Sequence, residues 1–575
     1  MERRIPYGIS NYEEAIKKQA YIVDKTRYIQ NLETIQNPVF LRPRRFGKSL
    51  FCSMLQSYYD LLSADFFSEL FQSSWIGTHP TPEHNKYIVL HLDFSVIENS
   101  GSFPEMKAGF ETYCNTCLTM LKVRYPGILD KMPDINPFLS SSSNLIVLLE
   151  YIRAAKTPQL YVIIDEYDNF ANQFIITCQD AVYEELTAGD SFLRTFFKIL
   201  KRGRQSGAIA QIFITGVLPI AIDDLASGYN IGTFLTLDPE FEHMMGFTKE
   251  EVETLVTRIY EDYGFDFATK TQVLDVITSQ YDGYHPATTD SESLYNPTML
   301  MFFFRQFCQT GLIPDQLTDL NLRTDLGFVK RITGMRSEDT EAFIRNLTLQ
   351  DTIPYDTEYL VTKFNMSQFF QKSYFPISFF YLGLLTRNDE FTLSVPNLNV
   401  RKIITEYLNE LYHIDVSTRY EDMMRRFIAR PDISVLFADY WSLYVSQLPE
   451  VIFMQVQENF YRTTFYELCS RYLSRWFTWN LERSYPKGRS DLEFVGKYLE
   501  KFANLRIIIE FKYISNNEFI KRFQNIDAIT LKDEDVRQIA GYVAGLKKEY
   551  PEVTVQQYVI YCVGNLGYKV FELDN

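Results

Sequence analysis

The feature that most constrains this chain is a loop ending in Gly47-Lys48-Ser49, which lies between an apolar segment and a helical one. Residues 37–41 predict a short strand, and residues 50–59 predict a helix. Strand, glycine-containing loop and helix in this order form the Walker A arrangement, in which loop amides and the helix N-terminus face phosphate oxygens. The full pattern begins with a glycine where this chain has Arg42, so the loop by itself is an incomplete match.

The expected roles in this loop follow from the chemistry of bound phosphate. Lys48 is expected to reach the β- and γ-phosphates, and Ser49 is expected to bind Mg²⁺. Gly47 and the two preceding arginines are expected to contact the nucleotide as well. Either of two arginine pairs fits the role of stabilising transition-state charge, with solvated surface arginines as the alternative: Arg44 with Arg45, and Arg202 with Arg204.

A second motif supports the interpretation of the loop. Residues 160–164 form an uninterrupted apolar run that ends in Asp165-Glu166. This is typical of a buried parallel strand whose carboxylates emerge at the edge where α/β proteins bind ligands. Asp165 is expected to hold Mg²⁺, and Glu166 is expected to polarise the attacking water. A strand that merely ends in acidic residues is the alternative, and the upstream Gly-Lys-Ser makes it the weaker one.

Two further strands are expected in this region. Residues 87–94 lie between the two motifs and fit the inserted strand of P-loop ATPases that carry a catalytic Glu after the Walker B Asp. Residues 209–216 follow a predicted helix over 192–204, and Thr215 near their end is a candidate sensor of the γ-phosphate. Thr is also a common strand residue, so a purely structural role for Thr215 stays open.

The C-terminal part of the chain carries a second set of carboxylates. Residues 488–495 predict a strand that contains Asp491, and residues 505–509 predict another, which is followed by Glu510-Phe511-Lys512. Asp491 and Glu510 are 19 positions apart, which is enough for a hairpin that brings them together. Glu510 and Lys512 are expected on one face of their strand. Two acids for Mg²⁺ and a lysine to orient or activate water are what metal-assisted phosphodiester hydrolysis needs.

Helices on both sides of these strands add candidates. Glu458, on a predicted helix over 457–472, is expected to complete the metal site, and Glu482 is a weaker candidate. Gln538 lies on a predicted helix over 534–546, after the E-x-K strand. The alternative is a solvated strand edge with an ion pair across its face.

Eight segments occur in the order in which a bacterial family described as AAA-ATPase-like has them, and the chain closely resembles that family over most of its length. They are residues 21–26, 42–49, 92–95, 165–168, 214–217, 245–252, 281–284 and 295–297. Members commonly carry a C-terminal nuclease-like domain of the PD-(D/E)XK superfamily, and the D…E-x-K pattern here is similar to it. In that family the Arg-Pro-Arg-Arg-Phe-Gly-Lys-Ser loop is usual, so Arg42 does not depart from the family. The resemblance implies ATP and Mg²⁺ as cofactors.

The expected fold is α/β, in four parts. These are a P-loop NTPase parallel sheet over residues 1–245, a helical lid over 246–335, a helical, winged-helix-like region over 336–430 and an α/β restriction-endonuclease-like domain over 431–575. Thr248 and Glu251 form an expected capping box at the start of the lid. Without a dense basic recognition helix, the winged-helix-like region is expected to serve packing.

Composition bounds the partners and the compartment. A net charge of −16 argues against non-specific binding of nucleic acid by the whole surface but allows a local basic groove. Nucleic acid, DNA in the first place, is the expected partner of the C-terminal domain, and a homo-oligomer is left open. No apolar run approaches the roughly 18 to 20 residues that span a bilayer, so no membrane partner and a cytoplasmic protein are expected. Cys114 and Cys117 form a C-x-x-C, expected to be two thiols on an amphipathic helix.

Two functions stay open after these observations. One is an ATPase region coupled to a Mg²⁺-dependent nuclease, for which the architecture alone suggests a role in defence or nucleic-acid processing. The other is a nucleotide-dependent switch, controlling regulation or oligomerisation, whose C-terminal domain is a catalytically inactive binding module.

Overall fold

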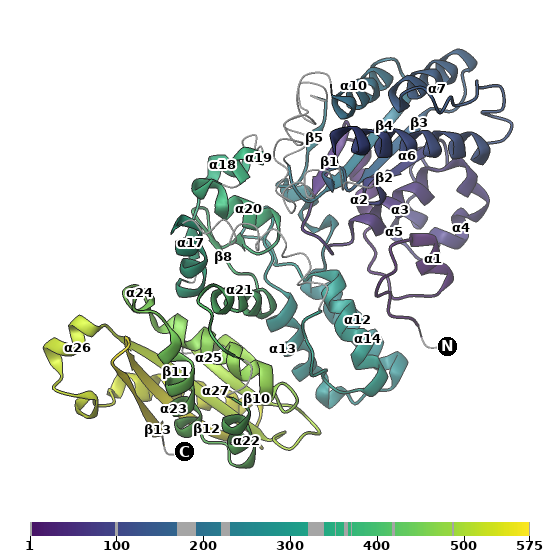
Figure 1. The fold of residues 1–575 in the computed structure, drawn as a ribbon. Helices are drawn as coiled ribbons and strands as arrows, with labels where there is room; N and C mark the ends of the chain where they lie inside the picture. Colours follow the sequence, from purple (N-terminus) through teal and green to yellow (C-terminus); the bar gives the residue numbers. More distant parts are fainter. Residues whose placement is uncertain are drawn as a thin grey trace.

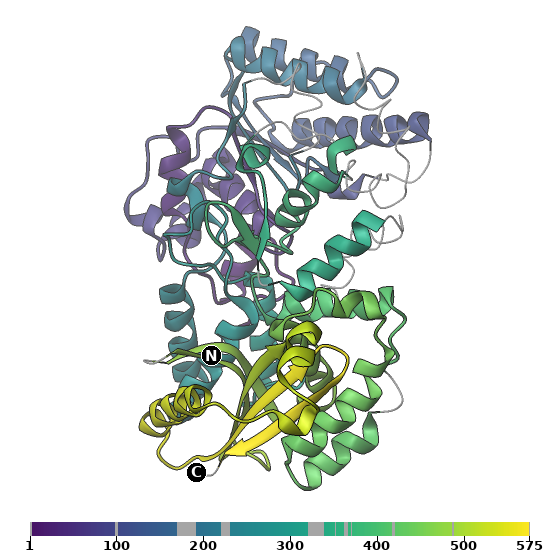
Figure 2. The same ribbon diagram turned by 90° about the vertical axis from the view of Figure 1, so that its left-hand side faces the viewer.

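The structure, a computed structural model, places two α/β units at opposite ends of the molecule with a mostly helical region between them (Figure 1). The view turned by 90° shows the same arrangement, with the C-terminal sheet below the N-terminal layers (Figure 2). The residues that the structure describes are 3–97, 102–169, 191–219, 231–319, 338–350, 352–361, 366–369, 371–416, 420–485 and 488–573.

The N-terminal sheet is parallel throughout and has the order β2-β3-β4-β1-β5. The predicted strands are confirmed, but the expectation that residues 87–94 form the strand inserted between the two motif strands is wrong. That strand is β4, and β2 lies at the edge of the sheet, because helical crossovers let strands pair in an order that differs from the chain order. The strands are β1 (Pro38–Leu41), β2 (Ile88–Asp93), β3 (Leu160–Asp165), β4 (Ile209–Gly216) and β5 (Thr233–Phe234).

Helices cover both faces of this sheet, as the fully buried apolar strands require. Helix α3 (Lys48–Tyr59) packs against one face, together with the side chains of Phe40 and Phe213. Val39, Ile164 and Ile214 face the other side of the sheet, in a separate apolar core. Three helices cover that core, which continues into the region after the lid: α6 (Phe103–Arg124), α7 (Ser141–Ala155) and α10 (Phe192–Gln205). Cys114 and Cys117 lie on α6 as free thiols.

In the region predicted to be a lid, which keeps that name below, three helices pack around an apolar core of their own. They are α12 (Lys249–Tyr263), α13 (Lys270–Tyr281) and α14 (Pro297–Thr310). The capping box at the start of α12 is confirmed, because the Thr248 side chain accepts from the Glu251 amide and Glu251 accepts from the Thr248 amide. The last part of the predicted lid region, from residue 320 onward, lies outside the described residues.

The region that follows the lid has the element order of a winged helix. Its antiparallel sheet has the order β6-β8-β7. All seven residues of the helix before the hairpin, α20, are buried, so this helix has no free face for a DNA groove, in keeping with a packing role. The elements are α17 (Glu338–Leu349), β6 (Thr352–Pro354), α20 (Phe375–Tyr381), β7 (Thr386–Arg387), β8 (Thr392–Ser394) and α21 (Leu398–Leu411).

The C-terminal domain is a five-stranded sheet between two helical layers. The sheet has the order β13-β12-β11-β10-β9, in which only β11 and β12 run parallel. Helices α22 (Glu421–Ala429), α23 (Ile433–Leu443) and α25 (Glu458–Leu473) pack on one face, and α27 (Asp533–Glu549) packs on the other. The strands are β9 (Phe477–Tyr485), β10 (Gly488–Gly496), β11 (Leu505–Ile514), β12 (Thr554–Val563) and β13 (Gly567–Leu573).

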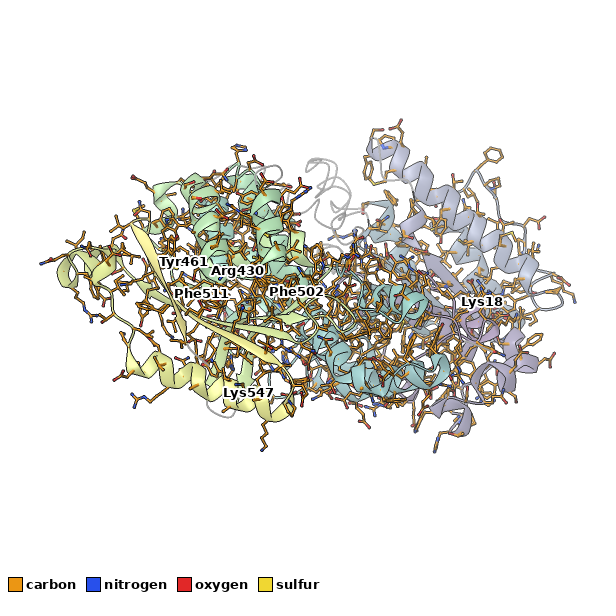
Figure 3. All side chains as sticks on the ribbon, turned by 90° about the horizontal axis from the view of Figure 1, so that it is seen from below. Lys18, Arg430, Tyr461, Phe502, Phe511 and Lys547 are labelled. Carbon is orange, nitrogen blue, oxygen red and sulfur yellow. The ribbon has the colours of Figure 1, made fainter. Side chains whose placement is uncertain are left out.

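Side chains fill the space between these parts, as the view from below shows (Figure 3). Within the described part of the chain, no helix is both long and apolar enough to span a membrane. Short helices complete the fold: α1 (Tyr12–Lys17), α2 (Arg27–Glu33), α4 (Phe67–Phe71), α5 (Trp75–Thr78), α18 (Thr357–Val361), α19 (Met366–Phe369), α24 (Glu450–Phe453) and α26 (Asn516–Arg522).

The contact between the lid and the winged-helix-like region leads to a prediction about thermal stability. Gly283 has a φ of 99°, and a Cβ added there would lie 2.0 Å from the carbonyl oxygen of Pro396. Gly264 also has a positive φ, 65°, but no atom lies within 4 Å of its added Cβ. We expect Gly283→Ala to lower the thermal midpoint by about 4 °C or more beyond Gly264→Ala, since such a clash costs about 2 kcal/mol. Equal midpoints for the two variants in a calorimetric scan would contradict this packing.

Candidate nucleotide and metal sites

The phosphate loop is shaped by backbone that turns sharply after β1. Gly47 has a φ of 91° and Arg45 a φ of 71°, and α3 begins at Lys48 directly after this turn. Glycine adopts such a φ without steric cost, which explains why Gly47 precedes the helix. The N-terminus of α3 therefore opens toward the loop, in the position where a helix binds an anion.

Lys48 is buried in this loop and has only weak partners there. Its side-chain nitrogen Nζ donates to the carbonyl oxygens of Arg42 at 3.1 Å and Pro43 at 3.0 Å. Burial lowers the pKa of Lys48, against the opposing charges of Glu166 and Asp165. Phosphate oxygens would satisfy this ammonium group better than neutral carbonyls do, because charge-assisted hydrogen bonds are stronger. The site is thus chemically fitted to the phosphates of a nucleotide.

Two carboxylates face Lys48 from the end of β3. Burial raises the pKa of Asp165, while a hydrogen bond with the side chain of Ser49 and the charge of Lys48 act against it. Burial also raises the pKa of Glu166, which brings this carboxylate closer to the range suited to a general base. The structure therefore brings together Lys48, Ser49, Asp165 and Glu166, as the sequence predicts, and Ser49 with Asp165 offers oxygen ligands that suit Mg²⁺.

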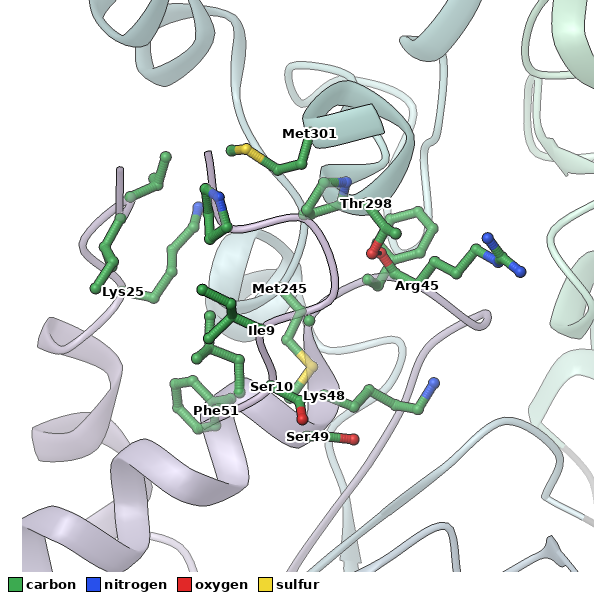
Figure 4. Close-up of a pocket in the computed structure, with 18 of the residues that line it drawn as sticks. Ile9, Ser10, Lys25, Arg45, Lys48, Ser49, Phe51, Met245, Thr298 and Met301 are labelled. Carbon is green, nitrogen blue, oxygen red and sulfur yellow. Dashed lines mark hydrogen bonds between the residues drawn. The ribbon is translucent and has the colours of Figure 1, made fainter. Parts of the chain in front are cut away.

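A cavity of about 490 Å³ opens beside these residues, which is an ordinary size for a small-molecule site. Arg44, Arg45, Gly47 and Glu166 line it along with Lys48 and Ser49. Figure 4 shows Lys48 and Ser49 side by side at one end, with Met301 and Lys25 at the other. The rest of the wall is largely apolar, which suits a flat base. It includes Ile9, Phe51, Met245, Phe247 and Met301, to which the sequence alone assigned no role.

Arg42 lies outside this cavity and has a structural role. Its guanidinium is 2% exposed and donates to the carbonyls of Thr236 at 2.8 Å and Glu242 at 3.1 Å. It also lies 4.3 Å from the centre of the Phe40 ring. Arg42 therefore joins the start of the loop to the segment after β5, which accounts for an arginine where the general Walker A pattern has glycine.

The other predicted nucleotide ligands differ in where they lie. Arg45 lines the cavity, but its guanidinium pairs with Asp319 at 3.0 Å. Thr215 is fully buried, and its hydroxyl donates to the carbonyl of Phe40 at 2.8 Å, so it does not line the cavity. Arg204 binds Asn37, which precedes β1, so it lies at the sheet edge opposite the phosphate loop. Arg202, on the same helix end, pairs with Glu150.

The second site lies where β10 and β11 run side by side. Their antiparallel register pairs Leu492 with Ile509, and one further step puts Asp491 next to Glu510. Asp491 Oδ2 accepts from the Phe511 amide at 2.7 Å. Residues 19 positions apart in the chain thus become neighbours through the hairpin that the sequence predicts.

Glu510 has one oxygen fully engaged and one without a partner. Oε1 accepts from Lys512 Nζ at 2.7 Å and from Gln538 Nε2 at 2.6 Å. Oε2 is buried and has no hydrogen-bond partner among the residues that the structure describes. Burial, followed by the charge of Asp491, raises the pKa of Glu510 to about 7, and the charge of Glu458 acts in the same direction. An unpaired buried oxygen is costly, and a divalent cation would satisfy it.

Sequence reasoning missed one residue of this site, Arg462. It lies on α25 one turn after Glu458, is 4% exposed, and approaches Asp491 Oδ1 at 3.4 Å. The same guanidinium pairs with Glu482 at 2.8 Å. Glu482 is thus the counter-charge of Arg462, which weakens its candidacy as a metal ligand further. The sequence did offer one signal for Arg462: it lies four residues after Glu458 on the same helix, a spacing that brings two side chains onto one face.

Two family models match this chain. Residues 6–226 match the family described as predicted AAA-ATPase, AAA-ATPase-like, and residues 456–572 match the PD-(D/E)XK nuclease superfamily. An uncharacterized protein in the vnfD 5′ region of Azotobacter chroococcum mcd 1 is 23% identical over 420 residues, which cover 71% of this chain and 70% of that protein. The predicted resemblance is confirmed.

The two matched parts contain the two sites. The cavity lies in the AAA-ATPase-like region, with a wall contributed by the lid residues Thr298 and Met301, which follow the matched segment. All four proposed residues of the metal site, from Glu458 to Lys512, lie in the PD-(D/E)XK domain. A region similar to the AAA-ATPase-like family and a region similar to the PD-(D/E)XK nuclease superfamily are therefore combined in one chain.

The raised pKa of Glu510 predicts how Mg²⁺ binding depends on pH. The carboxyl group must lose its proton before it binds the ion, so affinity should rise with pH up to about 7 and then level off. Between pH 6 and pH 8 we expect an increase of about tenfold for the nucleotide-free protein, measured by isothermal titration calorimetry. Glu510→Gln should bind more weakly and lose this dependence. Equal affinity of the wild-type protein at both pH values would contradict the prediction.

Proposed function

We propose that this protein binds and hydrolyses ATP with Mg²⁺ in its N-terminal cavity and cleaves DNA with Mg²⁺ in its C-terminal domain. The observation that carries the nuclease part is the buried Oε2 of Glu510, which has no partner among the described residues and lies next to Asp491 and Lys512. A binding module for nucleic acid needs no such oxygen, whereas a metal-dependent nuclease does.

In the C-terminal site, each side chain has a proposed role. Asp491 and Glu510 are the metal ligands, with Glu458 as the third carboxylate on the adjoining helix. Bound Mg²⁺ would supply Lewis acidity and lower the pKa of a water molecule. Lys512, held by Glu510, orients or activates the attacking water, and Gln538 donates the second hydrogen bond to the same Glu510 oxygen, Oε1.

In the N-terminal site, the chain supplies the usual parts of nucleotide hydrolysis. Lys48 neutralises phosphate charge, Ser49 and Asp165 hold the Mg²⁺, and Glu166 takes the proton of the attacking water. Arg44 and Arg45 line the phosphate end and contact the nucleotide, the latter after release from Asp319. Thr215 contributes indirectly, by holding β4 against β1 below the phosphate loop.

A second function is favoured by one specific contact. The Arg462 guanidinium approaches Asp491 and so already compensates part of the charge that a metal would neutralise. If Arg462 takes the place of the metal, the C-terminal domain binds nucleic acid without cutting it. The nucleotide then acts as a switch for regulation or for oligomerisation. A role in defence or DNA processing is inferred from the pairing of the two domains.

Two substitutions separate nucleotide binding from hydrolysis. Lys48→Met removes the cation that phosphate would bind, so ATP affinity should fall about 10- to 100-fold. Glu166→Gln leaves the loop intact and removes the proton acceptor, so turnover should fall at least about 100-fold while affinity stays within about threefold. Fluorescent-nucleotide titration and phosphate release measure the two quantities. Undiminished turnover in Glu166→Gln would rule out its role as general base.

Cleavage of single- and double-stranded DNA with Mg²⁺ tests the second site. Asp491→Asn should slow cleavage at least about 100-fold, the loss typical of removing one electrostatic group from an active site. Glu518→Gln, an exposed acid on α26 that pairs with Arg522, is the control and should leave the rate unchanged. Wild-type protein that binds DNA but never cuts it would favour the binding-module function instead.

A further inference from the structure

One segment of the lid contacts both the nucleotide cavity and the nuclease-like domain. Residues 311–319, which we call the strap, begin at Gly311 after helix α14 and end at Asp319. Helices α13 and α14 of the lid contact it through Tyr281 and Gln306, and helix α21 contacts it through Asn399. The contacts at the two ends of the strap differ in partner and in chemistry.

The cavity end of the strap is held by Asp319. This carboxylate is 2% exposed, and its Oδ2 accepts from Tyr7 at 2.6 Å and from Arg45 Nη1 at 3.0 Å. Both Tyr7 and Arg45 line the nucleotide cavity. The carbonyl of Arg45 also accepts from the Thr298 hydroxyl at 2.9 Å, so Arg45 is bound to the lid at two points.

The nuclease end of the strap is held by the turn that follows β10. Lys497, 3% exposed, donates to the carbonyls of Ile313 at 3.2 Å and Pro314 at 2.9 Å and pairs with Asp315 at 3.3 Å. The Tyr498 hydroxyl donates to the carbonyl of Gly311 at 2.7 Å. A buried ammonium with three oxygen partners is costly to pull away, so this end moves together with the turn.

The same turn is directly joined to the metal site. Lys497 follows Gly496, the last residue of β10, and Asp491 lies on that strand. Six residues of strand span roughly 20 Å, and β10 is paired on both sides, so it transmits a shift of the turn as a nearly rigid element. Asp491 itself stands outside the paired positions of both ladders, so a tilt of β10 alters how its carboxylate is set against Glu510.

Between its two ends the strap borders a cavity on one side and contacts the lid and helix α21 on the other. Residues 315–318 line a cavity of about 440 Å³, together with side chains of α21 and α25. The Tyr281 hydroxyl donates to the carbonyl of Leu317 at 2.8 Å, which steadies the strap from the lid side. The Thr318 hydroxyl donates to the Asn399 side chain of α21, and Leu317 packs against the apolar core of the lid. The middle of the strap is therefore held by a few contacts beside a cavity rather than inside a closed core.

We propose that nucleotide binding moves the strap and so controls the metal site of the nuclease-like domain. Phosphate entering the loop competes with Asp319 for the Arg45 guanidinium, because both are anions that this group binds. Once Arg45 turns to phosphate, the cavity end of the strap is released, and Lys497 carries the change to β10. This inference rests on the proposed function, since it describes how the first site regulates the second.

The test compares DNA cleavage with and without ATP, in full-length protein with Mg²⁺. Tyr498→Phe and Lys497→Met weaken the nuclease end of the strap. Tyr550→Phe is the matched control, because its hydroxyl reaches Asp275 of α13 at 3.5 Å and so joins the same two domains away from the strap. The conservative Tyr498→Phe keeps the test valid if the buried-lysine variant does not fold.

We expect ATP to change the wild-type cleavage rate about 5- to 150-fold, the range of ordinary allosteric coupling. The effect should fall below about twofold in Tyr498→Phe and Lys497→Met and persist in Tyr550→Phe. A full ATP effect in both strap variants, or its equal loss in Tyr550→Phe, would overturn the strap but leave the proposed function standing.

If no DNA is cut under any condition, hydrogen exchange still tests the strap separately from the nuclease function. That result would reject the nuclease function, while the strap would still predict that ATP changes exchange in residues 311–319 and 496–502. The change at 496–502 should disappear in Tyr498→Phe. Exchange in the wild-type protein that is the same with and without ATP would overturn the strap itself.

Discussion

Parallel pairing of β1 with β4, and of β4 with β3, is the constraint on which the N-terminal half depends. Parallel strands end at the same edge of a sheet, so the loop after β1 and the acids after β3 are brought together without any local signal between them. Thr215 strengthens this arrangement, because its hydroxyl binds the carbonyl of Phe40 across the β1–β4 pair. Lys48 then faces Asp165 and Glu166 at the mouth of the cavity.

The C-terminal domain follows a similar logic with antiparallel strands. The β10–β11 register sets Asp491 beside Glu510, and alternation along β11 places Lys512 on the face of Glu510. Two helices supply the remaining groups, Arg462 from α25 and Gln538 from α27. Each half therefore places buried charges that its own hydrogen bonds only partly satisfy, and phosphate and Mg²⁺ would complete them.

The sequence predicted what depends on short-range patterns. Apolar runs that end in acids identified β3 and β11, and the capping box identified the start of α12. Residues 42–49 were recognised as a phosphate loop even without the first glycine. Pairings over long separations could not be predicted this way: Arg45 meets Asp319, 274 residues away, and Lys497 meets Pro314, 183 residues away.

The same limit explains the errors. β4 lies between β1 and β3 because of how the crossovers pack. Nothing in residues 87–94 indicates that β2 would instead lie at the edge of the sheet. Thr215 lies near the end of a strand as expected, but its hydroxyl donates to the carbonyl of Phe40. That contact depends on which strand pairs with β4, and the sequence alone does not indicate the pairing. Arg42 likewise binds carbonyls that follow β5, almost 200 residues later in the chain.

The most direct test of two metal-dependent sites in one chain is the anomalous scattering of Mn²⁺ in crystals grown with a non-hydrolysable ATP analogue. We expect one ion at Ser49 and Asp165 beside the phosphates and another between Asp491 and the Oε2 of Glu510. An ion at Ser49 and Asp165 with none between Asp491 and Glu510 would contradict the account of the C-terminal domain as a metal-dependent nuclease.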